Sequence, residues 1–372
     1  MRIEPIKARV FRVLTATVLA TLLAGLAFSS APARAAHGGN HFNKPGNILI
    51  ADQFNNRVIE IDPLGDILFQ FGKGPDDFTP ASIIGCNDAE RVGRFTLMAG
   101  TGTPPNVVPN CSDPNGCPDN RVILVDERGR IRWQYGQFGV SGSGPNELNT
   151  PVQSTWLPSG NVLITDQANE RIIEVNAAKR IVWQYGVTGT SGNGPNQLNN
   201  PNSAQLLENG NILIADENND RAIEVERDKT IVATFTAGGT ASGVAFASRL
   251  PNGDTLLTDS NNSRAVEVDK HDHVVWQYVT NTDPASNPMP LPTRAIRLAN
   301  GNTIISDQFN HRVIIVDHGG NIVASYGTLN VSGYGTHNAN EGLFGPYDAK
   351  VIGDYTGLTP PRDDDDDGDD AD

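Results

Sequence analysis

The sequence predicts an all-β protein, a six-bladed β-propeller with four strands per blade, and three observations support this fold class. A motif of two short apolar runs joined by a polar turn recurs about every 50 residues, and this period is typical of solenoids, propellers and arrays. Further strand-like runs flank each copy, which brings each repeat to four strands. The first repeat lacks an inner strand, and the end of the chain supplies a matching one.

The recurring motif is a β-hairpin. In the first copy, the apolar run Ile48-Leu-Ile-Ala51 ends at Asp52, and Val58-Ile-Glu-Ile61 follows the polar turn. Short runs rich in Ile, Val and Leu that are bounded by Gly, Asn and Asp indicate strands rather than helices. Further copies occupy Gly160–Val175, Gly210–Val225, Gly253–Val268 and Gly301–Val316.

Each hairpin has a strand-like run on both sides. Runs ending in Trp-Gln-Tyr follow three of the hairpins, at residues 130–136, 180–186 and 273–278. Segments that open with proline precede three of them, at Pro151, Pro201 and Pro292. We therefore expect the proline-led segments to be the inner strands of the blades and the Trp-Gln-Tyr runs to be the outer strands.

Residues 1–35 resemble a secretory signal peptide and are not expected to belong to the fold. Lys7, Arg9 and Arg12 precede an apolar run from Val13 to Phe28, and Ala33-Arg-Ala35 offers a cleavage site between small residues. A membrane anchor is the alternative, but the run is shorter than the roughly 20 residues that a spanning helix needs. We expect a secreted or periplasmic protein without a membrane span in the mature chain, with residues 36–45 as a linker.

The propeller is predicted to span residues 46–356, with its ring closed by the last strand. The first blade has three strands before Pro80, and residues 345–352 supply its inner strand, which protects the sheet edges at the join. Blade two departs from the pattern. Its predicted inner strand is residues 80–86 and its second strand is residues 94–100, and residues 101–119 are inserted before the third.

Residues 357–372 are predicted to form a disordered acidic tail. Eight of the last ten residues are Asp, and so many like charges cannot pack together. The whole chain carries a formal charge of −15. An acidic surface without a basic stripe argues against nucleic acid and anionic membranes as partners.

Three cysteines are available in the oxidising compartment that the signal peptide implies. Cys111 and Cys117 lie within one short segment of the insertion, and a disulfide between them would hold its tip together. Cys86 lies on an apolar strand, where we expect a buried thiol. The alternative is a disulfide between Cys86 and one of the two loop cysteines.

The turn of the hairpin carries the pattern Asp-x-x-Asn-x-Arg, and near copies of Gly-Pro-Asn-x-Leu-Asn-x-Pro precede two inner strands, at residues 144–151 and 194–201. With these motifs, the chain resembles the NHL-repeat family of six-bladed propellers. The pattern stands at Asp52/Asn55/Arg57, Asp166/Asn169/Arg171, Asp216/Asn219/Arg221, Asp259/Asn262/Arg264 and Asp307/Asn310/Arg312. Blade two departs from it, with Gly100 in place of the Asp and only Arg121 retained. Because the pattern recurs at one phase of nearly every blade, we expect a structural role, in which the Asp caps the turn and the Arg bridges carboxylate and backbone.

Ligand-binding residues are expected where the blades differ, on the inner strands that surround the channel. Polar residues at alternate positions share one face of a strand. The second position after the residue that opens each inner strand reads Ser82, Gln153, Ser203, Phe246, Arg294 and Asp348, and the fourth reads Ile84, Thr155, Gln205, Ser248, Ile296 and Lys350. The predicted ligand-binding residues are Gln153, Ser203, Gln205, Arg294, Asp348 and Lys350. One interpretation is a salt-bridged channel that only plugs the ring. The other is a pocket for a small polar or anionic ligand with Arg294 as its anchor.

No catalytic residues can be assigned from the sequence. The histidines do not share a repeat phase on the inner strands, which argues against a His-rich zinc site. Calcium stays open as a ligand, because residues 113–119 place oxygen ligands at alternate spacing without the rest of a calcium loop. No other cofactor is indicated.

Fold alone does not determine function, since the relatives that the resemblance implies include binding scaffolds, peptidyl-amide lyases, lactonases and other hydrolases. We expect an exported, monomeric NHL-like binding or scaffold module that takes a protein or a small polar ligand at the channel mouth. The alternative is a hydrolase or lyase with its active site at the channel mouth, assisted by calcium.

Overall fold

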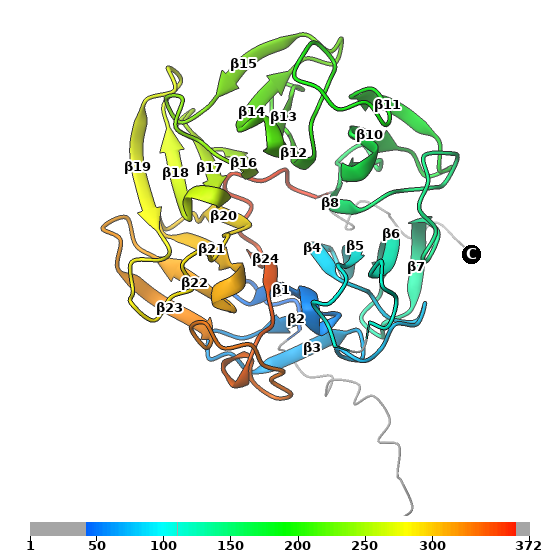
Figure 1. The fold of residues 1–372 in the computed structure, drawn as a ribbon, viewed down its shortest axis with the longest axis vertical. Helices are drawn as coiled ribbons and strands as arrows, with labels where there is room; N and C mark the ends of the chain where they lie inside the picture. The colour runs from blue at the N-terminus through cyan, green and yellow to red at the C-terminus, as the bar shows by residue number, and fades with distance from the viewer. Residues whose placement is uncertain (1–41, 110, 362–372) are drawn as a thin grey trace, which may run out of the picture. The chain divides into compact units, whose positions relative to one another are not determined.

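The computed structural model describes residues 42–109 and 111–361. In these ranges the chain forms six sheets of four antiparallel strands in a ring (Figure 1). This confirms the predicted six-bladed β-propeller. The predicted signal peptide and residues 362–372 of the predicted tail lie outside the described residues. Within the described ranges, no helix is both long and apolar enough to cross a bilayer.

Within each blade, the four strands follow one another from the inner edge of the sheet to its outer edge. Blades one to three comprise β24 Pro346–Val351, β1 Ile48–Asp52, β2 Arg57–Ile61 and β3 Ile67–Phe71; β4 Cys86–Val92, β5 Phe95–Thr103, β6 Cys117–Val125 and β7 Ile131–Gly136; and β8 Pro151–Trp156, β9 Val162–Asp166, β10 Arg171–Val175 and β11 Ile181–Tyr185. Blades four to six comprise β12 Pro201–Leu206, β13 Ile212–Asp216, β14 Arg221–Val225 and β15 Ile231–Phe235; β16 Val244–Arg249, β17 Thr255–Asp259, β18 Arg264–Val268 and β19 Val274–Val279; and β20 Arg294–Arg297, β21 Thr303–Asp307, β22 Arg312–Val316 and β23 Ile322–Gly327.

The ring closes as predicted, because the last strand of the chain completes the first blade. Strand β24 pairs antiparallel with β1, with Val351 opposite Ile48 and Asp348 opposite Ala51. Figure 1 shows β24, near the red end of the chain, beside the blue β1. Blade one therefore combines segments from both ends of the propeller.

The core is divided among the contacts between neighbouring blades. Strand β1 shows why its run is apolar throughout: Ile48 and Ile50 pack toward blade six, whereas Leu49 and Ala51 pack toward blade two. A strand that is buried on both faces needs apolar residues at consecutive positions. Apolar clusters of this kind lie between every pair of neighbouring blades in the described residues.

The repeated Asp-x-x-Asn-x-Arg turn joins each hairpin to the connection that precedes its blade. In blade one, the carboxylate of Asp52 accepts hydrogen bonds from Asn55 Nδ2, from Arg57 Nε and from the backbone N–H of Phe344, each at 2.8 Å. The prediction that the Asp caps its own turn was wrong, because its side chain accepts no capping bond there. The Arg does bridge carboxylate and backbone, since Arg57 Nη1 also donates to the carbonyl of Gly335.

The predicted position of the inner strand of blade two was wrong. The inner strand is β4, which begins at Cys86, rather than the proline-led segment 80–86. Segment 80–85 belongs to the connection between blades and is held by Arg121, whose guanidinium donates to the carbonyls of Pro80 and Ser82. Proline opens the inner strands of blades three and four, whereas Pro80 belongs to a connection, so a leading proline alone does not identify an inner strand.

Blade two has a carboxylate in the place of the motif Asp, although Gly100 stands at that position of the sequence. Asp119 accepts hydrogen bonds from Arg121 Nε and from the N–H of Ile84, two residues before β4. A Cβ atom on Gly100 would lie 2.5 Å from the Asp119 carboxyl carbon. Gly100 is therefore the residue that leaves room for a carboxylate supplied from the neighbouring strand.

The insertion of blade two packs onto blade one. A disulfide joins Cys111 and Cys117, and Cys86 is a buried free thiol. Val108 and Cys111 form an apolar cluster with Phe54, which lies in the short 3₁₀ helix η1 Gln53–Asn55. The disulfide thus holds together a loop that covers part of the neighbouring blade.

Candidate functional site

The inner strands of successive blades are linked by side-chain hydrogen bonds. At four junctions between blades, the second residue after the one that opens an inner strand accepts a hydrogen bond from a backbone N–H of the next inner strand. The donor is the third residue after the one that opens that strand. The four pairs are Asp348 with Ala89, Asp88 with Ser154, Gln153 with Ala204 and Ser203 with Ala247, at 3.1, 3.1, 2.6 and 3.2 Å. Inner strands are sheet edges, so these bonds satisfy backbone groups that no further strand pairs.

Two channel residues were missed in the sequence because blade two was misaligned. The predicted positions Ser82 and Ile84 lie in the connection, and β4 places Asp88 and Glu90 at the corresponding places. The signal that could have identified them is the alternation of acidic residues in Cys86-Asn-Asp-Ala-Glu, directly before the tight turn at Gly93-Arg94.

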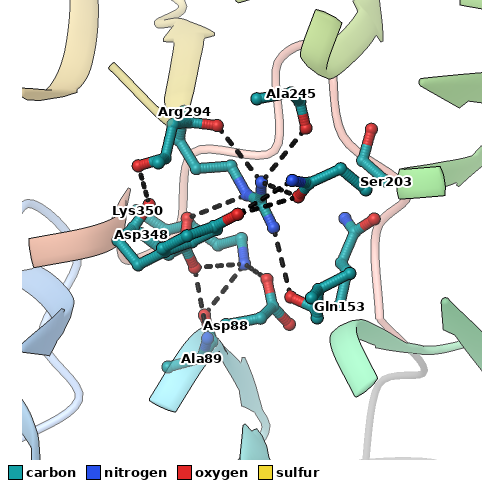
Figure 2. A network of polar contacts seen from close by, with 12 residues as sticks. Asp88, Ala89, Gln153, Ser203, Ala245, Arg294, Asp348 and Lys350 are labelled. Atoms are coloured by element: carbon teal, nitrogen blue, oxygen red, sulfur yellow. Dashed lines mark hydrogen bonds and ion pairs between the residues drawn. The ribbon is translucent and has the colours of Figure 1, made fainter. Parts of the chain in front are cut away.

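The charged centre of the channel is a partly buried lysine held by two carboxylates (Figure 2). Lys350 Nζ donates to Asp88 Oδ1 and to Asp348 Oδ2, both at 2.7 Å, and to the carbonyl of Ala89 at 2.9 Å. Burial by itself lowers the pKa of Lys350, but Asp348 and Asp88 outweigh this and raise it above its ordinary value. All three donors of the ammonium group are therefore engaged within the protein.

Arg294 crosses the channel from blade six and is fully buried. Its guanidinium donates to the carbonyl of Ala245 at 3.4 Å (Figure 2) and to that of Val152 at 3.3 Å. It also stacks on the rings of Phe246 and Tyr347. Its Nε lies 3.9 Å from Asp348 Oδ1. Burial raises the pKa of Tyr347 to about 12, so its ring beside Arg294 stays neutral. Arg294 thus connects blade six to blades three and five.

The last described residues cross one end of the channel. We call residues 353–361 the strap; Figure 1 shows this red segment running from β24 past β16 and β12. Asp354 Oδ2 accepts a hydrogen bond from the N–H of Ala299 at 2.8 Å, and Thr359 Oγ1 donates to the carbonyl of Leu206 at 2.9 Å. Residues 357–361, which the sequence assigns to the acidic tail, therefore lie against the propeller.

A pocket lies beneath the strap at this channel mouth. Both the inner strands and the strap contribute polar and apolar residues to its lining. These residues include Glu90, Gln153, Thr155, Gln205, Phe246, Lys350, Ile352, Tyr355, Leu358 and Thr359. The pocket has a volume of about 30 Å³, which is enough for roughly two water molecules. A larger ligand would have to displace the strap.

Glu90 is an acidic group of this pocket that lies on an inner strand. Its Oε2 accepts a hydrogen bond from the N–H of Trp156 at 3.3 Å. Burial raises the pKa of Glu90 well above its ordinary value; Lys350 opposes this rise, and Asp88 adds to it. A buried carboxyl group with a raised pKa in a pocket is typical of functional sites.

Replacing Glu90 with glutamine is expected to stabilise the protein at pH 8 and much less at pH 4. The folded state holds the Glu90 proton more tightly than the unfolded state does, so the stability of the unmodified protein falls as pH rises above the unfolded pKa. Glutamine removes this loss, so we expect the free energy of unfolding at pH 8 to rise by about 1–3 kcal/mol. This is the usual range for a buried polar group without adequate partners. Urea unfolding at pH 4, 6 and 8 measures the difference. Glu208→Gln on an exposed turn is the control, and a Glu90→Gln effect that does not change with pH would contradict this account.

The predicted ligand-binding residues divide into two groups. Gln153, Gln205 and Lys350 line the pocket. Ser203, Arg294 and Asp348 are buried deeper in the channel, where the contacts above hold them. Their roles as ligand-binding residues, and that of Arg294 as anchor, stay predictions.

No metal centre is assigned to the site. Across residues 42–109 and 111–361, no group of three or more His, Cys, Asp or Glu side chains is arranged to hold a metal ion. In the loop considered for calcium, the Asp113 carboxylate accepts a hydrogen bond from the N–H of Asn115 at 2.8 Å, within its own turn.

Comparison with known proteins shows the fold but no family. No protein-family model matches the sequence, and no curated protein matches it. Among solved structures, a protein of unknown function from Bacteroides caccae is 15% identical, with 76% of this chain and 93% of that chain covered and a TM-score of 0.53. A chain in a nidogen/laminin complex is 12% identical, with 82% and 98% covered and a TM-score of 0.52. A streptogramin B lyase is 13% identical, with 84% and 87% covered and a TM-score of 0.50.

Proposed function

We propose that the protein is an exported NHL-like binding module whose ligand site is the channel mouth beneath the strap. The observation that carries this proposal is the pocket there. Thr155, Gln205 and Glu90 supply hydrogen-bonding groups, while Ile352 and Leu358 supply apolar surface. A concave site with a few polar groups in an apolar lining is typical of small-molecule binding.

The state of the charged groups favours binding over catalysis. Lys350 directs its donors to two carboxylates and a carbonyl, and Arg294 directs its guanidinium to backbone carbonyls. A group that acts as acid or base must reach the substrate directly or through one water. These two cations instead support the ring, and neither is directed at a substrate in the pocket.

Several features support an exported protein with a ligand or protein partner. The amino-terminal segment has the pattern of a signal peptide, and the Cys111–Cys117 disulfide suits an oxidising compartment. The recurring Asp-x-x-Asn-x-Arg turn supports the likeness to NHL repeats. We propose a monomer that binds a protein or a small polar or anionic ligand and that does not bind nucleic acid.

The test is a thermal-shift screen of small polar molecules, including sugars, amino acids, hydroxy acids and sugar phosphates. We expect hits that raise the melting temperature by at least about 2 °C equally in EDTA and in calcium. Thr155→Leu narrows the pocket and removes its hydroxyl group, so it should abolish the shifts. Thr190→Leu, at an exposed loop position, should leave them unchanged. Hits that survive Thr155→Leu would place the site elsewhere, and a shift that needs calcium would favour the enzyme.

A hydrolase or lyase is the second candidate, and Glu90 is the observation that favours it. Burial raises the pKa of the Glu90 carboxyl group beside the pocket, and a raised pKa favours the role of a general acid. If a molecule from the screen is turned over, Glu90→Gln is expected to lower kcat by about 10²-fold or more while binding persists. Unchanged turnover in that variant would exclude Glu90 as the acid.

A further inference from the structure

The strap occupies the channel mouth in the way that a bound peptide would. It lies outside all six sheets, and its residues Gly357, Thr359 and Pro361 are buried whereas Pro360 between them is exposed. A segment that buries some of its residues and exposes others in this way lies against the propeller as a bound peptide lies against its receptor.

Two contacts of the strap show which side chains the channel mouth accepts. Leu358 packs against the apolar cluster between blades one and six, which includes Phe246 and Ile296 of the channel wall. Thr359 Oγ1 donates to the carbonyl of Leu206 at the end of inner strand β12. The mouth therefore accepts an aliphatic side chain on one wall and a hydroxyl group on the opposite wall.

Glycine is required just before these two residues. Gly357 has a φ of +70°, and a Cβ atom there would lie 3.4 Å from Leu250 Cδ2 and from Ser248 Oγ. A side chain would be strained by the backbone conformation and close to blade five. The turn of the strap thus favours glycine, and the walls of the mouth take the aliphatic residue and the hydroxylated residue that follow it.

The hold on the strap is limited. Its backbone joins no strand ladder, and Leu358 N–H bonds within the strap, to the carbonyl of Tyr355. The contacts that attach it to the propeller include the Asp354 and Thr359 hydrogen bonds and the packing of Leu358. Segments with few such contacts open at lower free energy than the fold as a whole.

We propose that the strap is a tethered ligand of the channel mouth, and that the mouth binds a peptide of a partner protein, folded into the same turn, when the strap is displaced. The peptide has a small residue, an aliphatic residue and a hydroxylated residue in sequence, like Gly357-Leu358-Thr359. This inference rests on the proposed function of the mouth as a ligand site and names the partner class for it.

The tether makes the strap a strong competitor. A segment joined by a short linker has an effective concentration in the millimolar range. A free peptide therefore binds the full chain far more weakly than it binds a chain whose strap is absent. This difference separates binding at the mouth from binding elsewhere on the surface.

The experiment uses a chain that ends at Asp354 and the acetylated peptide Tyr-Thr-Gly-Leu-Thr-Pro-Pro, which reproduces residues 355–361. In an NMR titration, we expect the shortened chain to bind this peptide at least about tenfold more tightly than the full chain does. The same peptide with aspartate in place of the leucine should lose at least about tenfold in affinity. Full-length Leu358→Asp, which keeps the tail but weakens the strap, should gain affinity for the unmodified peptide.

Other results would overturn the inference. Equal binding to the full and shortened chains would place the peptide outside the mouth. One such result is that neither the shortened chain nor full-length Leu358→Asp binds the peptide, while the shortened chain still binds molecules from the thermal-shift screen. In that case the partner class is wrong and the proposed function stands. If the shortened chain binds neither the peptide nor any molecule from the screen, the proposed function fails as well. Loss of cooperative unfolding in both variants would show that the strap is an integral part of the fold.

Discussion

A chain that ends at Gly345 is expected to lose the cooperative unfolding transition of the full protein. Strand β24 is the inner strand of blade one, and without it β1 presents an unpaired apolar edge. The removal also takes away Lys350 and Asp348, so Asp88 loses its cation in the channel. We expect a loss of at least about 5 kcal/mol, which is the lower end of the stability of typical domains.

Urea unfolding followed by circular dichroism and tryptophan fluorescence measures this effect. The matched control is the chain that ends at Asp354, which keeps β24 and loses most of the strap. We expect this control to unfold in a single transition, with the two probes coinciding. A chain ending at Gly345 that also unfolds cooperatively with unchanged stability would show that the ring does not depend on its closing strand.

Replacing Arg294 with alanine is expected to lower the free energy of unfolding by about 3–5 kcal/mol, as is usual when one partner of a buried charged group is removed. The guanidinium bonds to the carbonyls of Val152 and Ala245, and its stacking partners are Phe246 and Tyr347. Alanine leaves these carbonyls without donors and opens a cavity where the side chain was. Chemical denaturation at pH 7 measures the change.

Arg227→Ala is the control for the loss of an arginine. The Arg227 side chain is 39% exposed, pairs with Glu174 and lies over Trp183. Exposed ion pairs contribute about 0.2–1 kcal/mol, so we expect a far smaller effect. If Arg294→Ala costs no more than this control, Arg294 is not a structural connection across the channel and its predicted role as a ligand anchor gains support.

The candidate site shows how far sequence reasoning reaches. The positions of Gln153, Gln205 and Lys350 at the pocket follow from counting along inner strands, because side chains alternate between the two faces of a strand. Counting failed for Asp88 and Glu90, since the residue that opens β4 is Cys86 and not a proline. The strap could not be anticipated, because residues 357–361 precede an acidic run and carry no strand pattern.

The sequence by itself determined the period, the number of blades and the closure of the ring. These features follow from local patterns: apolar runs that form strands, the repeated turn, and a last strand that matches the gap in blade one. Only the tertiary structure decided that Arg294 crosses to blades three and five, that Lys350 lies between Asp88 and Asp348, and that the strap covers the mouth. Such contacts join residues far apart in the chain, and their distances depend on how the closed ring brings the inner strands together.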